Sequence, residues 1–267
     1  MTGFDVGQRE EDLKRLQGLR LIDDDFMTAC LDGYAEGAQL ILNVILDRED
    51  LVVSEVRTQK AMKNLQGRDV WLDIYATDSS GAKYDIEVQR SDKGADRKRA
   101  RYHSSMMDAD MLKSGDDYSE LHESYVIFIT ENDVMGDGLP VYHIERGIVE
   151  EGNLPFDDGE HIIYVNASLR PSDTALGRLM SDFYCTNAAD MNYSELAEKV
   201  RFFKEKEEGV ESMCRAMDEL RDETALKTRI ENAARMIASG KLSLEDIALF
   251  SGLPIEKVRE LAGEKTA

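Results

Sequence analysis

The chain contains 267 residues, of which 33 are Lys or Arg and 54 are Asp or Glu, so that its formal net charge is −21. An acidic surface of this kind repels polyanions, which argues against nucleic-acid binding over most of the surface. A hydrophobic content of 42% is enough for a folded core and argues against a wholly disordered chain. At this length we expect one large α/β domain, or a domain with a tail.

Cysteine usage and the apolar runs indicate the compartment. Cys30, Cys185 and Cys214 are far apart and form no CxxC motif, so neither a zinc ribbon nor a disulfide framework is indicated. Three reduced thiols are typical of a cytoplasmic protein. Residues 1–15 are polar and lack the apolar core of a signal peptide, and the longest apolar run, residues 40–46, is too short to span a bilayer. We therefore expect no membrane association.

The first quarter of the chain carries helical patterns and then a strand. Residues 1–20 form a polar lead-in with partial helical character. Residues 26–46 carry apolar side chains at spacings of three and four, which predicts an amphipathic helix. Glu36 lies on this helix, where a solvated carboxylate is the common role. Residues 51–63 predict a short strand followed by a loop.

Residues 69–90 predict a β-hairpin around which the chain is organised. Apolar side chains alternate with polar or aromatic ones over residues 70–76, and residues 78–81 are turn-forming types. In the second strand, Ile86 and Val88 alternate with acidic and amide side chains.

Pairing these strands about Ser80 brings Asp73 opposite Glu87 on one face, with Cβ atoms about 5 Å apart. Like charges in that position destabilise a hairpin, and a divalent cation between the carboxylates would remove the repulsion. Gln89, two positions after Glu87, projects on the same face. Two interpretations are open at this point: a metal site, or a solvated polar face with a slipped register.

A basic segment follows the second strand directly. Its six basic residues are Arg90, Lys93, Arg97, Lys98, Arg99 and Arg101. They outnumber Asp92 and Asp96, so that residues 90–101 carry a net charge of +4. Residues 96–113 predict a helix that Gly115 ends. The basic residues form either a solvated helix face or a surface that contacts phosphates.

The rest of the chain predicts two buried strands and then a series of helices. The strands are residues 125–130 and 161–166, and the acidic segment between them predicts loops and an edge hairpin. Helices follow over residues 171–184 and 192–206, and the chain stays helical from there on. No metal-ligand spacing connects the four histidines, which we expect to be structural or exposed: His103, His122, His143 and His161.

Residues 243–261 predict a helix, a turn at Gly252 and a second helix. The second helix carries Glu256 and Glu260 besides two basic residues, which makes a poor surface for the major groove of DNA. Packing or protein contact is therefore the favoured role of this pair of helices.

Asp73 followed by Glu87-Val88-Gln89 resembles the D…(D/E)xK core of the PD-(D/E)XK nuclease superfamily. The wider pattern is similar to the Rpn-like branch of recombination-promoting nucleases and transposases. The matching segments are residues 40–46, 72–74, 84–89, 97–102, 112–118 and 125–130. The resemblance runs from about residue 20 to about residue 205 and depends on the order and spacing of all the segments.

This resemblance implies a restriction-endonuclease-like α/β fold, with a mixed central sheet flanked by helices over residues 1–205 and an all-helical C-terminal extension over residues 206–267. It implies DNA cleavage that depends on Mg²⁺ or Mn²⁺. By position, Asp73 and Glu87 would ligate the metal, assisted by the backbone carbonyl of Val88. Gln89 stands where the superfamily usually has lysine, and it offers a neutral amide that would orient a water or hold the phosphate.

The same resemblance extends to further residues and partners. Glu36 is the candidate for an additional acidic catalytic residue on the first helix. The residues expected to contact DNA are Arg90, Lys93, Arg97, Lys98 and Arg101. A homodimer is a further expectation, since many nucleases of the superfamily are dimers. Two functions remain open: a metal-dependent DNA endonuclease of the recombination-promoting type, or a catalytically weak or inactive relative that acts through protein–protein contacts.

Overall fold

A computed structural model describes residues 3–64 and 67–263 of the chain. These residues form two compact units, which are described separately: residues 17–64 with 67–206, and residues 3–16 with 207–263. The predicted division after residue 205 differs from these units in the placement of residues 1–16.

The larger unit is built on a six-stranded mixed sheet with the strand order β1-β2-β3-β4-β8-β5. The strands are β1 (Val53–Met62), β2 (Val70–Asp78), β3 (Lys83–Gln89), β4 (Ser124–Thr130), β5 (Val141–Ile144) and β8 (Glu160–Asn166). β3, β4 and β8 are parallel to one another, whereas β1, β2 and β5 pair antiparallel with their neighbours. The predicted fold class, a restriction-endonuclease-like mixed sheet flanked by helices and followed by C-terminal helices, is confirmed.

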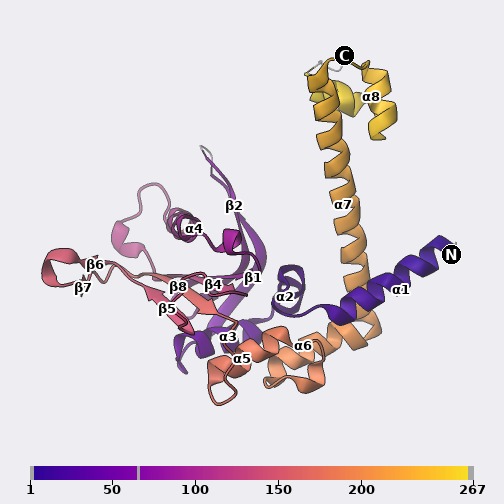
Figure 1. The fold of residues 1–267 in the computed structure, drawn as a ribbon. Coiled ribbons are helices and arrows are strands. Elements are labelled where there is room, and N and C mark those ends of the chain that lie inside the picture. Colours follow the sequence, from indigo (N-terminus) through magenta and orange to yellow (C-terminus); the bar gives the residue numbers. More distant parts are fainter. Residues whose placement is uncertain (1–2, 65–66, 264–267) are drawn as a thin grey trace. The chain divides into compact units, whose positions relative to one another are not determined.

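Helix α4 (Arg97–Met111) connects β3 to the parallel strand β4 and covers one face of the sheet (Figure 1). The helix begins at Asp96, whose side chain accepts a hydrogen bond from the amide of Lys98 at 2.8 Å. Ala100 and Met107 of the helix lie in one apolar cluster with Phe128 of β4. Because this crossover follows the end of β3 so closely, the first turns of α4 lie beside the last residues of that strand.

On the opposite side of the sheet, α3 (Ala35–Leu46) lies against the strands, and α5 (Ala175–Tyr184) and α6 (Ser194–Glu205) pack against α3 (Figure 1). Helix α2 (Asp24–Leu31) precedes α3 and packs on β1, β2 and β3. The single helix predicted over residues 26–46 is therefore wrong. Gly33 adopts a left-handed φ of 61°, which glycine favours because it has no Cβ atom, and this residue separates α2 from α3.

The predicted boundaries of β1 and α4 also differ from the structure. β1 runs for ten residues to Met62 instead of giving way to a loop, because it pairs with β2 along its length. α4 ends at Met111, and Leu112 is already extended with φ −98° and ψ 138°. Gly115, with φ 102°, lies in the following turn and not at the end of the helix.

The acidic segment between β4 and β8 has little regular structure besides β5. A short hairpin is formed by β6 (Gly147–Ile148) and β7 (Leu154–Pro155). Single 3₁₀ turns complete the unit: η1 (Asp92–Ala95), η2 (Tyr118–Glu120), η3 (Val149–Glu151) and η4 (Ala188–Asp190).

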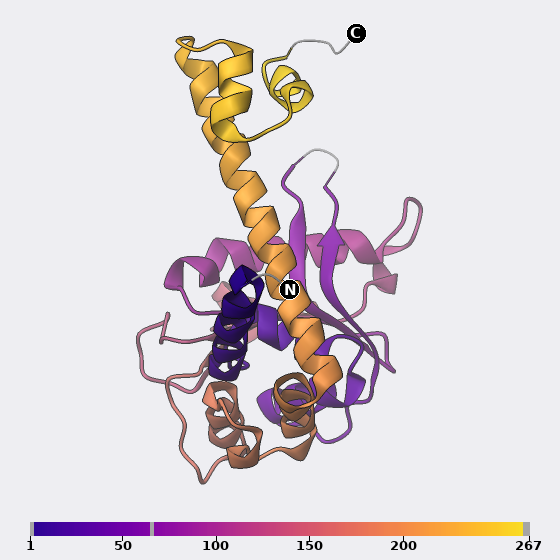
Figure 2. The same cartoon turned by 90° about the vertical axis from the view of Figure 1, so that its right-hand side faces the viewer.

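The smaller unit consists of α1 (Gly3–Gly18, whose last two residues belong to the larger unit), the 33-residue helix α7 (Glu207–Ser239), α8 (Leu244–Ser251) and α9 (Ile255–Leu261). α8 and α9 pack against the end of α7 through buried apolar residues that include Ala233, Ile247 and Val258 (Figure 2). Gly252 makes the predicted turn with a φ of 67°. No helix in the described ranges is long and apolar enough to cross a membrane.

Candidate active site

The ladder between β2 and β3 opens at Asp73 and Glu87. Its regular pairs run from Thr77 with Lys83 to Ile74 with Ile86, which is the register expected for a hairpin centred on Ser80. One residue further, the backbone amide of Asp73 donates a hydrogen bond to Oε1 of Glu87 at 3.1 Å. The Glu87 carboxylate therefore accepts the hydrogen bond of a backbone amide that has no strand partner, at the point where regular pairing stops.

Three carboxylates are buried at this opening. Glu87 and Asp85 are fully buried, and Asp73 is 6% exposed. Asp85 and Glu87 lie two residues apart on β3 and therefore project on the same face of the sheet. Sequence reasoning did not single out Asp85, although the alternation that placed Glu87 and Gln89 on one face applies to Asp85 as well.

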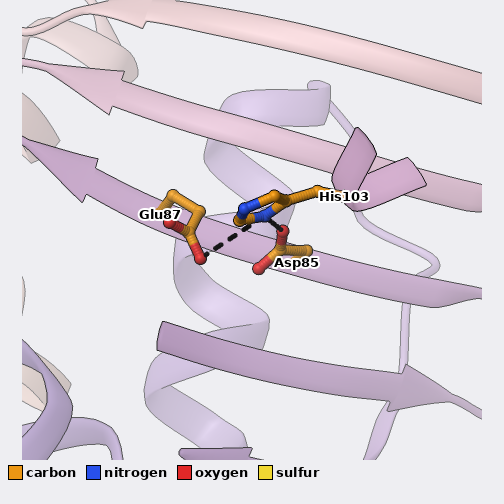
Figure 3. A group of neighbouring side chains, drawn as sticks. All are labelled: Asp85, Glu87 and His103. Atoms are coloured by element: carbon orange, nitrogen blue, oxygen red, sulfur yellow. Dashed lines mark hydrogen bonds and ion pairs between the residues drawn. The ribbon is translucent and has the colours of Figure 1, made fainter. Parts of the chain in front are cut away.

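Two residues of α4 complete the group. Arg99 donates from Nη2 to Oε2 of Glu87 at 2.8 Å and from Nε to Nε2 of His103 at 3.2 Å. Nδ1 of His103 lies 2.9 Å from Oδ2 of Asp85 and 3.8 Å from Oε1 of Glu87 (Figure 3). His103 is 3% exposed. These contacts join α4 to β3 through charged and polar side chains, in the middle of an otherwise apolar interface.

The hydrogen bonds assign the protons of His103. A guanidinium group has no acceptor, so Nε2 of His103 must accept from Arg99. Nδ1 then carries the proton of the neutral ring and donates it to Asp85. Burial lowers the pKa of His103 to about 4, which agrees with a neutral imidazole at physiological pH.

Burial also raises the pKa values of the three carboxyl groups. For Asp73 the largest cause is desolvation, followed by the nearby charges of Glu87 and Asp24. The pKa of Glu87 is raised first by desolvation and then by the charge of Asp85. The pKa of Asp85 is raised first by desolvation and then by the charge of Asp73. Each carboxylate thus opposes ionisation of its neighbours, while Arg99 lowers all three pKa values.

Gln89 is the last residue of β3 and lies close to Glu87 and Gly94. Its Nε2 is 3.5 Å from Oε2 of Glu87. A Cβ atom at Gly94 would lie 1.8 Å from Oε1 of Gln89, so any residue other than glycine at position 94 would force the glutamine to move. The carbonyl of Gly94 also accepts a hydrogen bond from Nη1 of Arg99 at 3.1 Å.

Asp24 is an additional acidic residue near the site that sequence reasoning did not single out. Asp24 lies in the first turn of α2, and its charge acts on Asp73 strongly enough to raise the pKa of that residue. Desolvation in turn raises the pKa of Asp24 itself. Glu36 is exposed on α3, and none of the described interactions joins it to the buried carboxylates. Its predicted catalytic role stays a prediction that the geometry does not favour, since α2 and not α3 presents an acid to Asp73.

The basic segment divides into three groups. Arg99 turns inward to Glu87. Arg90 is bound to Asp23 at 2.7 Å and to Glu131 at 3.2 Å, so its charge is largely compensated within the unit. The side chains of the other four predicted DNA contacts are exposed: Lys93, Arg97, Lys98 and Arg101.

The donor atoms at the site fit a divalent cation. Among the described side chains, Oδ2 of Asp73 and Oδ1 of Asp85 are buried without a hydrogen-bond partner, a costly arrangement that a hard cation would relieve. Asp85, Glu87 and His103 offer ligand atoms that lie within 4.8 Å of one another (Figure 3). Carboxylate oxygens suit Mg²⁺ and Mn²⁺, whereas imidazole suits later transition metals better.

The mixed sheet and the carboxylates at the opened ladder define a protein of the restriction-endonuclease-like class. A family model described as PD-(D/E)XK nuclease family transposase matches residues 38–170, which include β1 to β8 and α4. Through this segment the chain belongs to that family. No curated protein and no solved structure matches the chain.

Proposed function

We propose that the chain is a divalent-metal-dependent DNA endonuclease of the recombination-promoting type, which hydrolyses phosphodiester bonds. The observation that carries the proposal is the meeting of Asp73 and Glu87 where the β2–β3 ladder opens, with Oδ2 of Asp73 buried and unpaired. A carboxylate pair in this state costs folding free energy, and a cation between the two would offset that cost.

Asp73 and Glu87 would hold the cation, with the carbonyl of Val88 as a further ligand. Val88 follows Glu87 on β3, and its backbone amide lies near enough to the Asp73 carboxylate to lower the pKa of that residue. A bound Mg²⁺ or Mn²⁺ supplies polarisation of the phosphate and a water of lowered pKa. Asp85 offers a further carboxylate beside Glu87, whereas both ring nitrogens of His103 are already engaged, by Arg99 and by Asp85.

The side chains around this pair suggest a division of tasks. Gln89 can donate and accept hydrogen bonds, and its position between Glu87 and Gly94 suits it to orient a water or a phosphate oxygen. The exposed basic residues of η1 and α4 would contact backbone phosphates without reading bases. They would confine DNA to one part of a surface that is otherwise acidic.

The test is nicking of supercoiled plasmid DNA in Mg²⁺ and in Mn²⁺ by the wild type, Asp73→Asn and Glu87→Gln. We expect cleavage by the wild type alone, with a loss of at least about 10²-fold in either variant. Glu198→Gln, an exposed carboxylate on α6, is the matched control and should cleave as the wild type does.

Two results would contradict the proposal. Equal nicking by the wild type and Asp73→Asn would identify a contaminating nuclease. No nicking by any protein, across both metals and with single-stranded as well as duplex DNA, would favour the alternative of an inactive relative that acts through protein contacts. The net charge of −21 is the observation that keeps this alternative in view. A homodimer and a cytoplasmic location stay predictions.

A further inference from the structure

Arg99 is the one cation that the described residues place inside the carboxylate group. Asp73, Asp85 and Glu87 are all buried there, and Gln89 is neutral. Arg90, the nearest basic residue along the strand, is paired with Asp23 and Glu131. A phosphodiester that approached these carboxylates would be repelled unless a positive charge contacted it. A metal ion would supply part of that charge, and Arg99 is the protein group placed to supply the rest.

The guanidinium of Arg99 still has hydrogen-bonding capacity to offer. Three of its five N–H groups are used, for Glu87, His103 and the carbonyl of Gly94. Its side chain is 38% exposed, whereas Glu87 behind it is fully buried. The remaining N–H groups can therefore meet a ligand that approaches from solvent, and the planar fork of a guanidinium matches two oxygens of a phosphate.

His103 and Asp85 fix the direction of this guanidinium. Nε2 of His103 accepts from Nε of Arg99, and Nδ1 of the same ring donates to Asp85. His103 and Asp85 are buried, at 3% and 0% exposure, so water does not compete for the hydrogen bonds that they make. An arginine held at its Nε, at Nη1 and at Nη2 loses little further entropy when it binds an anion.

We propose that Arg99 is the catalytic residue that contacts the phosphate undergoing cleavage, and that His103, fixed by Asp85, is the positioning residue that orients the Arg99 guanidinium. This inference rests on the proposed nuclease function. The proposal gives Arg99 a different role from Lys98 and Arg101, its exposed neighbours on α4. Those two residues would contact phosphates elsewhere along the DNA.

The first test is steady-state nicking of a labelled DNA duplex by Arg99→Gln and Arg99→Lys. We expect Arg99→Gln to lower kcat by roughly 10²-fold with little change in KM, because the contact is made at the reacting phosphate. Arg99→Lys should recover only part of kcat, since an ammonium has three donors and no planar fork and cannot keep all three protein contacts of Arg99 while it also contacts a phosphate. Lys98→Gln should instead raise KM, and Arg201→Gln, an exposed residue on α6, should change neither.

The positioning role is tested by His103→Gln and His103→Leu. The amide of glutamine can still accept from Arg99 and donate to Asp85, whereas leucine can do neither. We expect His103→Leu to lower kcat about 10-fold or more and His103→Gln to recover most of it. Equal kcat values for His103→Leu and the wild type would overturn the positioning role. Equal kcat values for Arg99→Gln and the wild type would overturn the catalytic role, while the nuclease function would stand.

A second measurement does not depend on cleavage. The ¹⁵N NMR signals of arginine side chains can be followed in Asp73→Asn during titration with a short DNA duplex, and the signal that disappears in Arg99→Lys belongs to Arg99. A shift of the Arg99 Nε signal on DNA binding supports the contact even if the wild type fails to nick DNA. An unchanged Arg99 Nε signal at saturating DNA overturns the inference. This NMR measurement does not require Arg99→Gln to fold.

Discussion

The amide of Asp73 is bonded to the side chain of Glu87, at 3.1 Å, one residue beyond the last regular pair of the β2–β3 ladder. The two carboxylates are therefore neighbours because the hairpin itself opens between them. The backbone geometry keeps them together although their charges repel each other. Arg99 and the backbone amides of Asp73 and Val88 offset this local conflict only in part, since both pKa values stay raised. It underlies the first two predictions.

Replacing Asp73 with asparagine should stabilise the protein in the absence of divalent cations. The substitution removes one member of a repelling buried pair, whose pKa values are both raised. We expect an increase of about 1 kcal/mol or more in the free energy of unfolding near neutral pH, measured by urea denaturation. A decrease would mean that Asp73 makes a net favourable contribution to the fold, contrary to this view of the site.

The stabilising effect of a divalent cation should grow with pH. Because the folded-state pKa values of Asp73 and Glu87 lie above their unfolded values, the stability that they contribute is complete below the unfolded values, near pH 4. It is lost as pH rises toward about 8. A bound cation displaces these protons and reverses the loss.

The rise in Tm on adding Mn²⁺ should therefore be larger at about pH 8.5 than at about pH 6.5, where His103 is already neutral. Thermal melts at constant ionic strength measure this effect, and Glu87→Gln should abolish it. A metal response that is the same at both pH values would place the cation away from these carboxyl groups.

Gly94→Ala should displace Gln89 and lower nicking activity with little effect on Tm. The added methyl group would fall 1.8 Å from Oε1 of Gln89, which is the end of a side chain that can swing away. Gln89→Ala alone should have a similar activity, and the double variant should be no worse than either single variant. Gly7→Ala, where nothing lies within 4 Å of the added atom, is the control.

The exposed basic residues of α4 should contribute to DNA affinity in a salt-dependent manner. In Lys98→Gln/Arg101→Gln we expect weaker binding to all duplexes and a salt dependence whose slope falls by about 2, one for each phosphate that no longer has a basic partner. Arg90→Gln should change affinity less, because Arg90 is already paired with Asp23 and Glu131. Fluorescence anisotropy over a series of salt concentrations measures both effects.

Lys204 is expected to be the most sensitive lysine of the larger unit. It is 5% exposed, and its Nζ donates to the backbone carbonyls of Gln17, Leu19 and Thr186. Lys204→Met keeps the length of the side chain but leaves three carbonyls unpaired, which should cost roughly 2–4 kcal/mol of unfolding free energy. Lys206→Met, an exposed neighbour, should cost almost nothing in the same urea titration.

The sequence by itself determined the hairpin, its centre at Ser80 and the pairing partners Asp73 and Glu87. Alternation with period two and a turn segment are local properties, and they specify register without knowledge of the rest of the chain. The same local signals predicted the buried strands β4 and β8, and the order of motifs predicted the fold class. They failed at residues 26–46, where a helical pattern continues across Gly33 although the chain bends there.

Only the tertiary structure decided which side chains surround the carboxylate pair. Arg99 lies in a run of basic residues that look alike in sequence, and the docking of α4 on the sheet turns it, together with His103 four residues later, toward β3. Asp24 reaches the site from α2, which is far away along the chain. The face that a helix presents to a sheet depends on the packing of apolar residues such as Met107 and Phe128. That packing is a property of the assembled core and leaves no local pattern in the sequence.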